Sequence, residues 1–342
     1  MLPKCASKLA NSKLIVDMKL FLNLFTFAFI LTSCATVPVS ISPTATIVLP
    51  RASATLPISH TFTATIIPPP IPQATATSIT SIPCDAQLED YCITQGHFIL
   101  HRPIKAPAND LVDQTYPYGS TSRSTREPHH GVEFLNKFGT PVHAAADGLV
   151  VFAGADKEAV YSPWQYFYGN VIVIAHEDKL FTLYAHLSEI NVEAGMDVQM
   201  GEKIGEVGQS GVATGSHLHF EVRHGDVEDY FATENPELWL VPNIDENGHA
   251  LGTLMISVVD ESAQLLFSEI TVQYYLDRSQ PNVRAYYIDT YSNDMALGNE
   301  NAALSDLPAG IYRIALTMNG QLYERWVEVE SGKLTEVVFL IE

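Results

Sequence analysis

Short apolar runs separated by glycine and polar turns fill the middle of the chain. Between residues 84 and 242, runs rich in Val, Ile, Leu, Phe and Tyr occur at 148–152, 170–174 and 180–184, and helical spacing of apolar residues is scarce. Such runs between turn residues are typical of strands rather than helices. The pattern therefore predicts an antiparallel, mostly β domain over residues 84–242.

A second set of alternating runs begins after Pro242 and Gly248. It includes residues 254–258, 270–274 and 312–316, and the turn sequence Leu-Pro-Ala-Gly stands at 307–310. Alternating strands joined by such turns are typical of a sandwich. We expect a small C-terminal β-sandwich over residues 250–342, which makes the folded part of the chain all-β.

The first 34 residues have the pattern of an export signal. Scattered lysines precede an apolar run at 20–31, which is too short to span a bilayer, and small residues follow it. Leu31-Thr32-Ser33-Cys34 resembles the lipobox of bacterial lipoproteins, in which the cysteine becomes the lipid-modified first residue of the mature protein. This predicts lipidation of Cys34 and a membrane anchor, with Met18 as an alternative start to Met1. An ordinary cleaved signal or a short uncleaved anchor is the alternative.

Residues 35–83 have one formally charged residue, Arg51, and repeat Thr, Ser, Ala and Pro. Prolines recur too often for a helix or a central strand, so we expect an extended linker.

Beyond this linker, Cys84 and Cys92 are the two cysteines outside the leader and the lipobox. In the oxidising exterior that an export signal indicates, these two predict a disulfide. No other ligand pair at the usual distance supports a zinc site made from them.

Charge is distributed unevenly along the chain. Residues 1–83 contain five of the 19 basic residues and one of the 39 acidic ones, which leaves 14 basic and 38 acidic residues in 84–342. Such an acidic surface repels phosphate backbones, so nucleic acid is not an expected partner.

Two histidine-containing segments have the residue types of a metal site. His217-Leu218-His219-Phe220-Glu221-Val222 alternates like a half-buried strand, so His217 and His219 face one side at a separation of roughly 7 Å. That spacing suits one metal ligand beside one catalytic group. Upstream, His129 and Glu133 flank Gly131, where a bend would allow both to reach one metal. Two histidines and a carboxylate with an open fourth position form a catalytic zinc ligand set.

These segments resemble the lysostaphin and LytM-type peptidoglycan endopeptidases. The resemblance covers about residues 117–223 and includes, in family order, Gly139-Thr140-Pro141-Val142, Asp147-Gly148, Tyr168-Gly169-Asn170, Tyr184-Ala185-His186-Leu187, Gly201-Glu202-Lys203-Ile204-Gly205 and Gly215-Ser216 before the second histidine segment. It implies one zinc ion bound by His129, Glu133 and His219, with His186 and His217 as catalytic groups beside the attacking water. It also implies a substrate in the peptide part of peptidoglycan.

One departure from the family pattern concerns the carboxylate, because Glu133 stands where the family usually has Asp. Zinc accepts either carboxylate at similar bond lengths. A catalytically degenerate homologue, which would bind cell wall or activate another hydrolase, is the main alternative. A third possibility is that the C-terminal sandwich is an adhesion or carbohydrate-binding module, although no aromatic stripe there is distinctive.

The remaining histidines have less specific interpretations. His130 is adjacent to an expected ligand and could replace it after a register shift, although the resemblance favours His129. His176 is expected to be a structural or groove residue, and His143, His97 and His101 ordinary polar residues. Tyr118 is a candidate for lining the substrate groove.

Overall fold

The computed structural model describes residues 84–122, 124–291, 295 and 300–342. The predicted signal, the lipobox cysteine Cys34 and the linker at 35–83 lie outside the described residues. Within the described ranges, no helix combines the length and the apolar character that crossing a bilayer requires.

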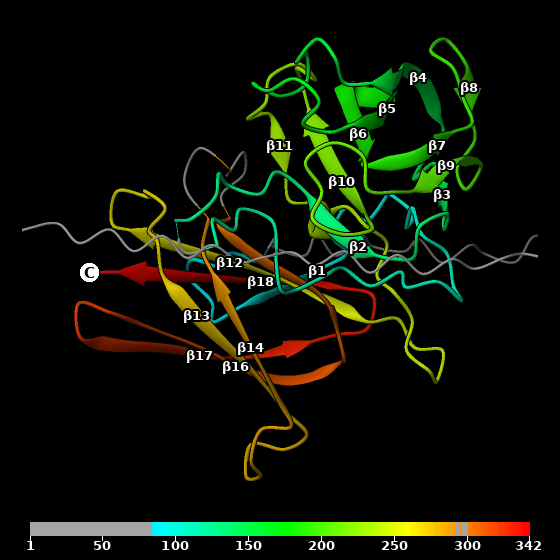
Figure 1. The fold of residues 1–342 in the computed structure, drawn as a ribbon. Coiled ribbons are helices and arrows are strands. Elements are labelled where there is room, and N and C mark those ends of the chain that lie inside the picture. Colours follow the sequence, from blue (N-terminus) through cyan, green and yellow to red (C-terminus); the bar gives the residue numbers. More distant parts are fainter. Residues whose placement is uncertain (1–83, 123, 292–294, 296–299) are drawn as a thin grey trace, which may run out of the picture. The chain divides into compact units, whose positions relative to one another are not determined.

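The described part of the chain is built from β-strands, as the apolar runs predict (Figure 1). Two single 3₁₀ turns, η1 (Glu177–Lys179) and η2 (Pro236–Leu238), accompany the strands. The predicted strands at 148–152, 170–174 and 180–184 correspond to β4 (Gly148–Ala155), β5 (Asn170–Ala175) and β6 (Leu180–Ala185). The expected all-β fold class is confirmed.

The first half of the described chain forms two antiparallel sheets. One has the order β11-β10-β6-β5-β4-β8, with β2 also paired to β10. The other has the order β3-β9-β7. The remaining bounds are β2 (Val132–Leu135), β3 (Pro141–His143), β7 (Leu187–Ile190), β8 (Asp197–Val198), β9 (Lys203–Val207), β10 (His217–His224) and β11 (Thr233–Glu234).

An apolar core joins these two sheets and fixes the orientation of β10. Leu218, Phe220 and Val222 of β10 are completely buried in it, together with residues of β2, β5 and the smaller sheet. The odd-numbered residues of β10 must therefore point to the opposite face. That face is also closed, because a second cluster that includes Tyr168 and Tyr230 covers it. The expected half-buried strand is thus buried on both faces, and its polar residues lie inside the protein.

The C-terminal part is a two-sheet sandwich, as predicted. Its sheets have the orders β1-β18-β12-β15 and β14-β13-β16-β17, and their inner faces share one apolar core. The pairing of β12 with β18 is parallel, whereas the other pairings are antiparallel. The bounds are β12 (Gly252–Asp260), β13 (Glu269–Tyr275), β14 (Arg284–Asp289), β15 (Ala302–Leu307), β16 (Gly310–Met318), β17 (Gln321–Val329) and β18 (Leu334–Ile341).

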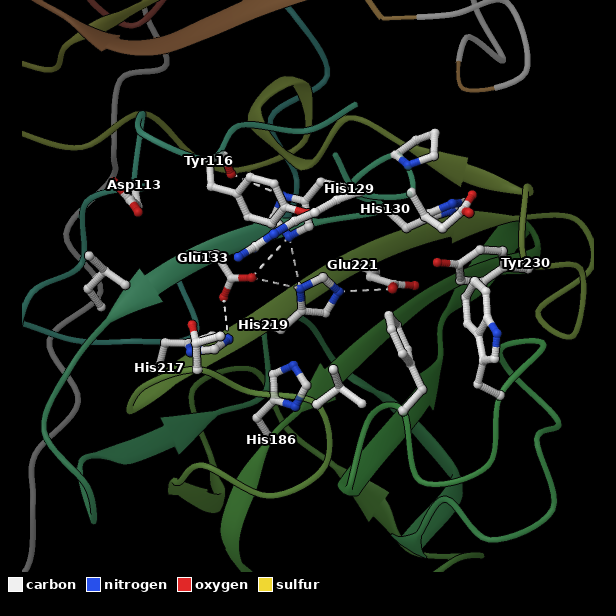
Figure 2. Close-up of a pocket in the computed structure, with 18 residues that line it drawn as sticks. Asp113, Tyr116, His129, His130, Glu133, His186, His217, His219, Glu221 and Tyr230 are labelled. Atoms are coloured by element: carbon white, nitrogen blue, oxygen red, sulfur yellow. Dashed lines mark hydrogen bonds and ion pairs between the residues drawn. The ribbon is translucent and has the colours of Figure 1, made fainter. Parts of the chain in front are cut away.

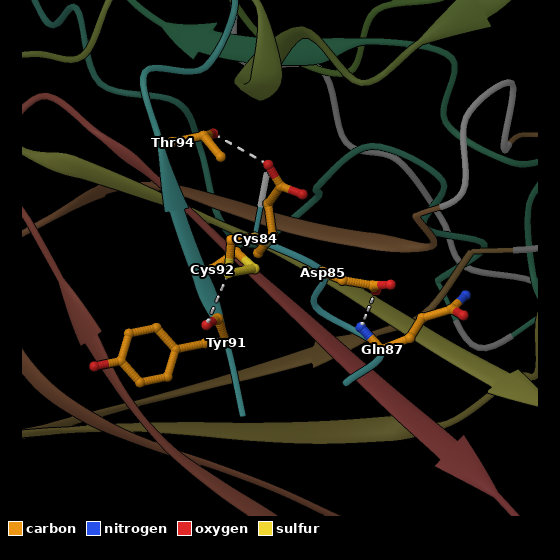
Figure 3. The surroundings of a disulfide bond; sticks show 7 residues. Cys84, Asp85, Gln87, Tyr91, Cys92 and Thr94 are labelled. Atoms are coloured by element: carbon orange, nitrogen blue, oxygen red, sulfur yellow. Dashed lines mark hydrogen bonds between the residues drawn. A yellow bond between two sulfur atoms is a disulfide. The ribbon is translucent and has the colours of Figure 1, made fainter. Parts of the chain in front are cut away.

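The first strand, β1 (Cys92–Thr94), pairs with β18 and so lies in the C-terminal sheet, although the sequence pattern grouped it with the earlier domain. Residues 92–94 complete the edge of that sheet, where Thr94 Oγ1 donates to Glu336 Oε1 at 3.1 Å. A disulfide joins Cys84 to Cys92 at the start of this strand (Figure 3). It ties the beginning of the described chain to the C-terminal sheet.

Candidate metal centre

The pairing of β2 with β10 brings three candidate ligands to one point. Glu133 of β2 lies directly opposite His219 of β10, and His129 precedes β2 by three positions. His129 Nε2 lies 3.0 Å from Glu133 Oε1 and 3.1 Å from His219 Nδ1, and the last two atoms are 3.2 Å apart. All three side chains are buried, and they converge in Figure 2.

Gly131 permits this approach because it stands at a bend where β2 meets β10. A Cβ at this position would clash with the backbone oxygen of Phe220 and lie 2.9 Å from the His219 ring. Its φ is not among the positive values, so the glycine is required for close packing rather than for a left-handed turn. The expected role of Gly131 is therefore refined: it provides room between the two ligand-bearing segments.

Hydrogen bonds on the far side of each ring direct the two ligand imidazoles. His129 Nδ1 lies 3.0 Å from the backbone oxygen of Tyr116, which leaves Nε2 facing the cluster. His219 Nε2 lies 3.0 Å from Glu221 Oε1, which leaves Nδ1 facing the cluster. A ring N–H that donates to oxygen leaves the other nitrogen with a lone pair, as metal ligation requires.

Glu221 is itself fixed by two completely buried partners. Tyr168 donates its hydroxyl to Glu221 Oε1 at 2.6 Å, and Arg223 Nη2 lies 2.7 Å from Glu221 Oε2. Burial alone would raise the pKa of Glu221, but Arg223 and His219 hold it at about 2. This carboxylate is therefore an anion in the protein interior, and it orients His219. Glu221 and Arg223 have no predicted role from the sequence, although their alternation with His217 and His219 places all four on one face.

The charge of Glu133 is maintained against its burial. Burial would raise the pKa of Glu133, but the close imidazoles of His129, His217 and His219 hold it well below its usual range. The longer side chain, in the position where Asp is usual, brings one oxygen to His129 and His219. The second oxygen lies 2.8 Å from His217 Nε2.

The three ligand atoms fit a zinc ion. Around a tetrahedral zinc with bonds of about 2.0–2.1 Å, ligand atoms lie roughly 3.3 Å apart. The three distances in this cluster, 3.0, 3.1 and 3.2 Å, are close to that value, and the donors are one carboxylate oxygen and two imidazole nitrogens. The donor set and spacing of the cluster are those that a metal site requires.

His186 and His217 flank this cluster without belonging to it. His186 follows β6 with a φ of 61°, a conformation that non-glycine residues rarely adopt, and its Nδ1 lies 2.8 Å from the Ser210 carbonyl oxygen. His217 Nδ1 lies 3.0 Å from the Gly215 carbonyl oxygen. The two rings are 4.9 Å apart between centroids, and both line the same pocket (Figure 2).

Burial lowers the pKa of His186 to about 3. His186 is therefore a neutral imidazole at pH 7. Because its Nδ1–H donates to a carbonyl, its Nε2 has a lone pair available to accept a proton.

The pocket that contains these groups has a volume of about 690 Å³. Aromatic side chains that the sequence analysis did not single out form much of its wall. Tyr116 stacks on His129 at 4.1 Å, and Trp164, Phe167 and Tyr230 line the other side. Trp164 and Phe167 come from the loop between β4 and β5, which has no regular pattern that could have predicted their position.

The structure also places the other residues that the sequence analysis considered. His130 stacks on Tyr230 at 3.7 Å and is not part of the ligand cluster. His176 is structural, because its ring nitrogens lie 2.7 Å from the Asp147 carbonyl oxygen and 2.8 Å from Thr182 Oγ1. The expectation that Tyr118 lines the groove is wrong: this side chain is only 3% exposed and packs behind the site. The groove tyrosine in its segment is Tyr116.

Comparison with known proteins agrees with this geometry. Residues 127–230 match the profile of peptidase family M23. They include all three cluster residues and both flanking histidines. Over 95 residues, the chain is 42% identical to the DD-carboxypeptidase/endopeptidase Mpg of Neisseria meningitidis and 40% identical to the peptidoglycan DD-endopeptidase ShyA of Vibrio cholerae. Each match covers 28% of this chain and 20% of the relative, so the chain spans about a fifth of the length of these relatives.

Among solved structures, the catalytic domain of the antimicrobial peptidase lysostaphin from Staphylococcus simulans is 28% identical, with a TM-score of 0.28. That match covers 44% of this chain and 94% of the lysostaphin domain. The family profile confirms the resemblance found in the sequence. The similarity to peptidase family M23 extends over residues 127–230 of this chain.

Proposed function

We propose that this protein is a zinc-dependent endopeptidase that hydrolyses peptide bonds in peptidoglycan. The observation that carries the proposal is the convergence of His129 Nε2, Glu133 Oε1 and His219 Nδ1 within 3.2 Å of one another, beside two further imidazoles in one pocket. The peptidoglycan substrate is supported by relatives whose names describe them as acting on peptidoglycan or as DD-endopeptidases.

His129, Glu133 and His219 would hold the zinc ion, and His186 and His217 would serve the reaction. When bound, zinc supplies Lewis acidity toward water and toward the scissile carbonyl. His186 presents a neutral Nε2 that can accept a proton from water and return it to the leaving amine. His217 lies on the same side, where its ring can orient the attacking water and stabilise the developing oxyanion. The aromatic wall holds the peptide and excludes water.

Two measurements on the purified full-length chain test this function. Zinc content is expected to approach one ion per chain, and digestion of purified wall sacculi is expected to release free amino groups. Dialysis against a chelator should abolish release, and added zinc should restore it. A chain that binds zinc stoichiometrically but releases no amino groups would be the degenerate wall-binding homologue instead.

We further propose that the protein works outside the cytoplasm, attached to the membrane through Cys34. The Leu31-Thr32-Ser33-Cys34 sequence supports the anchor, and the Cys84–Cys92 disulfide supports an oxidising compartment. Stable attachment requires more than one acyl chain, which lipoprotein processing supplies. Cys34→Ala should move the protein from the membrane fraction to the soluble fraction. Unchanged fractionation and mass would exclude lipidation at this cysteine.

A further inference from the structure

The C-terminal sandwich lies against the segment that supports two of the proposed metal ligands. We propose that Tyr291, together with Met295, is a positioning residue for the metal centre, and that the sandwich thereby sets the affinity of the site for zinc. This inference rests on the metal site proposed above. Residues 113–120 are called here the supporting segment.

The supporting segment makes backbone contacts to both sides of the ligand cluster. The amide of Gly119 donates to the His129 carbonyl oxygen at 2.7 Å, and the amide of His129 donates to the Ser120 carbonyl oxygen at 3.0 Å. The Tyr116 carbonyl accepts from the His129 ring, as described above. At the other end, the amide of Asp113 donates to the Glu133 carbonyl oxygen at 2.9 Å. A displacement of this segment therefore displaces His129 first.

Tyr291 packs against the supporting segment, where it contacts Gly119 and Tyr118. Gly119 has a φ of 73°, and a Cβ built on it would clash with the Cβ of Tyr291, so Gly119 packs directly against the Tyr291 side chain. The rings of Tyr118 and Tyr291 meet edge to face, with centroids 5.1 Å apart. Tyr291 is 3% exposed and belongs to the same apolar core as Val132 of β2.

A hydrogen-bonded bridge adds a second connection. The Tyr118 hydroxyl lies 2.8 Å from the carbonyl oxygens of both Met295 and Thr233, and 3.0 Å from Thr233 Oγ1. It can donate to one carbonyl and accept from the threonine hydroxyl. Met295 is completely buried in the core that contains β2. One phenol group thus links the supporting segment, the end of the peptidase sheet and the C-terminal part of the chain.

Tyr291 is in turn held by the sandwich. Its amide donates to the Asn301 carbonyl oxygen at 2.7 Å, and its hydroxyl donates to Glu300 Oε1 at 3.0 Å. Asn301 directly precedes β15, and its side-chain oxygen accepts from the amide of Val258 of β12 at 2.9 Å. The position of Tyr291 is therefore fixed by sandwich strands, and its ring transmits that position to Gly119 and on to His129.

Zinc affinity and backbone protection of the full-length chain test this assignment. Tyr291→Ala removes the ring and should weaken zinc binding about 10- to 100-fold, the range found when groups behind a metal ligand are removed. Affinity would be measured by competition with a chromophoric chelator, at a temperature where the variant is folded. The amides of Gly119 and His129 should also exchange with solvent faster, a readout that requires no metal.

Two controls separate positioning from general loss of stability. Tyr291→Phe keeps the ring and loses the hydroxyl contacts with Glu300 and Asn235, so its zinc affinity should stay within a few-fold of the wild type. Tyr312→Ala truncates a completely buried tyrosine in the sandwich core, so it should lower the melting temperature without changing zinc affinity. If Tyr291→Ala fails to fold, Tyr118→Phe removes the bridging hydroxyl alone and should weaken zinc binding several-fold.

The outcomes separate this inference from the proposed function. Equal zinc affinity and equal amide exchange in Tyr291→Ala and wild type would overturn the positioning role while leaving the peptidase proposal intact. If Tyr312→Ala weakens zinc binding as much as Tyr291→Ala does, the loss of affinity reflects general destabilisation of the protein. That result would also overturn the positioning role of Tyr291. A wild-type chain that binds no zinc would refute the proposed function, and amide exchange would still decide whether Tyr291 supports His129.

Discussion

His217 and His219 stand two positions apart on β10, and their imidazoles meet different atoms. His219 Nδ1 completes the ligand cluster, whereas His217 Nε2 contacts the outer oxygen of Glu133. His219→Ala should therefore lose zinc and activity together. His217→Ala and His186→Ala should keep near-normal zinc and lose hydrolysis by about 10²- to 10⁴-fold, as expected for proton-transfer groups.

Zinc content and amino-group release would be measured for the three variants, with the exposed His224→Ala as a control outside the pocket. His186 and His217 are proposed to serve the same transition state. The fold-loss of hydrolysis in the double mutant should therefore be smaller than the product of the fold-losses in the two single mutants. Loss of zinc in His217→Ala with retention in His219→Ala would reverse the assignment of the two positions.

The Glu133 carboxylate makes two kinds of contact that substitution can separate. Glu133→Ala removes the ligand oxygen and should strip zinc. Glu133→Asp keeps the donor type and should retain zinc, but the shorter side chain should lose the contact with His217 and change the activity. Metal analysis at limiting zinc would measure the first effect. Full occupancy in Glu133→Ala would remove this residue from the ligand set.

Glu221 is completely buried, and its contact with His219 Nε2 determines which nitrogen of His219 faces the cluster. Glu221→Gln should weaken zinc binding about 10- to 100-fold, because the amide no longer fixes the tautomer as an anion does. It also leaves the buried Arg223 without its anionic partner, which typically costs about 3–5 kcal/mol of stability.

The double variant Glu221→Gln with Arg223→Met separates these two effects. It removes the unpaired charge, so it should recover much of the melting temperature without recovering zinc affinity. Recovery of both together would show that Glu221 acts on stability alone.

At the scale of elements, the site depends on how closely β2 approaches β10. Gly131→Ala introduces a Cβ against the Phe220 carbonyl, so it should separate the two strands, cost about 1–3 kcal/mol of stability and weaken zinc binding. Thermal unfolding and chelator competition would measure these effects.

Gly215→Ala is the matched control, because a Cβ there meets nothing within 4 Å and its φ is not positive. It lies just before β10, so it tests a glycine of the same neighbourhood. Gly215→Ala should leave both stability and zinc affinity near the wild-type values. Equal effects of the two substitutions would exclude close packing as the reason for Gly131.

At the scale of the whole molecule, a buried carboxylate joins the two halves. Glu237 of η2 is completely buried, and its Oε2 accepts from the Ser305 hydroxyl at 2.6 Å, the Ser305 amide at 2.7 Å and Gln114 Nε2 at 2.9 Å. Burial raises the pKa of Glu237 above its usual value, although these donors oppose the shift. The folded state therefore favours the protonated form more than the unfolded state does.

The stability that Glu237 contributes is therefore complete at a pH below the usual carboxyl pKa of the unfolded chain. It is lost as the pH rises through the higher pKa of Glu237 in the folded protein. Glu237→Gln removes this pH dependence. The melting temperature of the variant minus that of the wild type should therefore be larger at pH 8 than at pH 4. The exposed Glu324→Gln should show no such trend from burial. A difference between Glu237→Gln and wild type that is constant with pH would contradict the assignment.

The sequence by itself determined the fold class and the chemistry of the candidate site. Alternating apolar runs predicted the strands of both halves, because burial of one strand face dictates a two-residue period. The spacing around Gly131 and the alternation of His217 with His219 indicated a metal site, and the resemblance to the lysostaphin and LytM-type family implied His129, Glu133 and His219 as its ligands. These residues lie in short segments whose local geometry limits where their side chains can point.

The tertiary structure decided everything that depends on contacts distant in sequence. The Arg223–Glu221–His219 connection has a visible alternation, but only the burial of both faces of β10 makes it a charged network inside the protein. Tyr118 is buried rather than groove-lining because Tyr291, 173 positions later, covers it. The pairing of β1 with β18 joins the beginning of the described chain to its end. Such contacts are chosen by the packing of the whole core, and no local pattern encodes them.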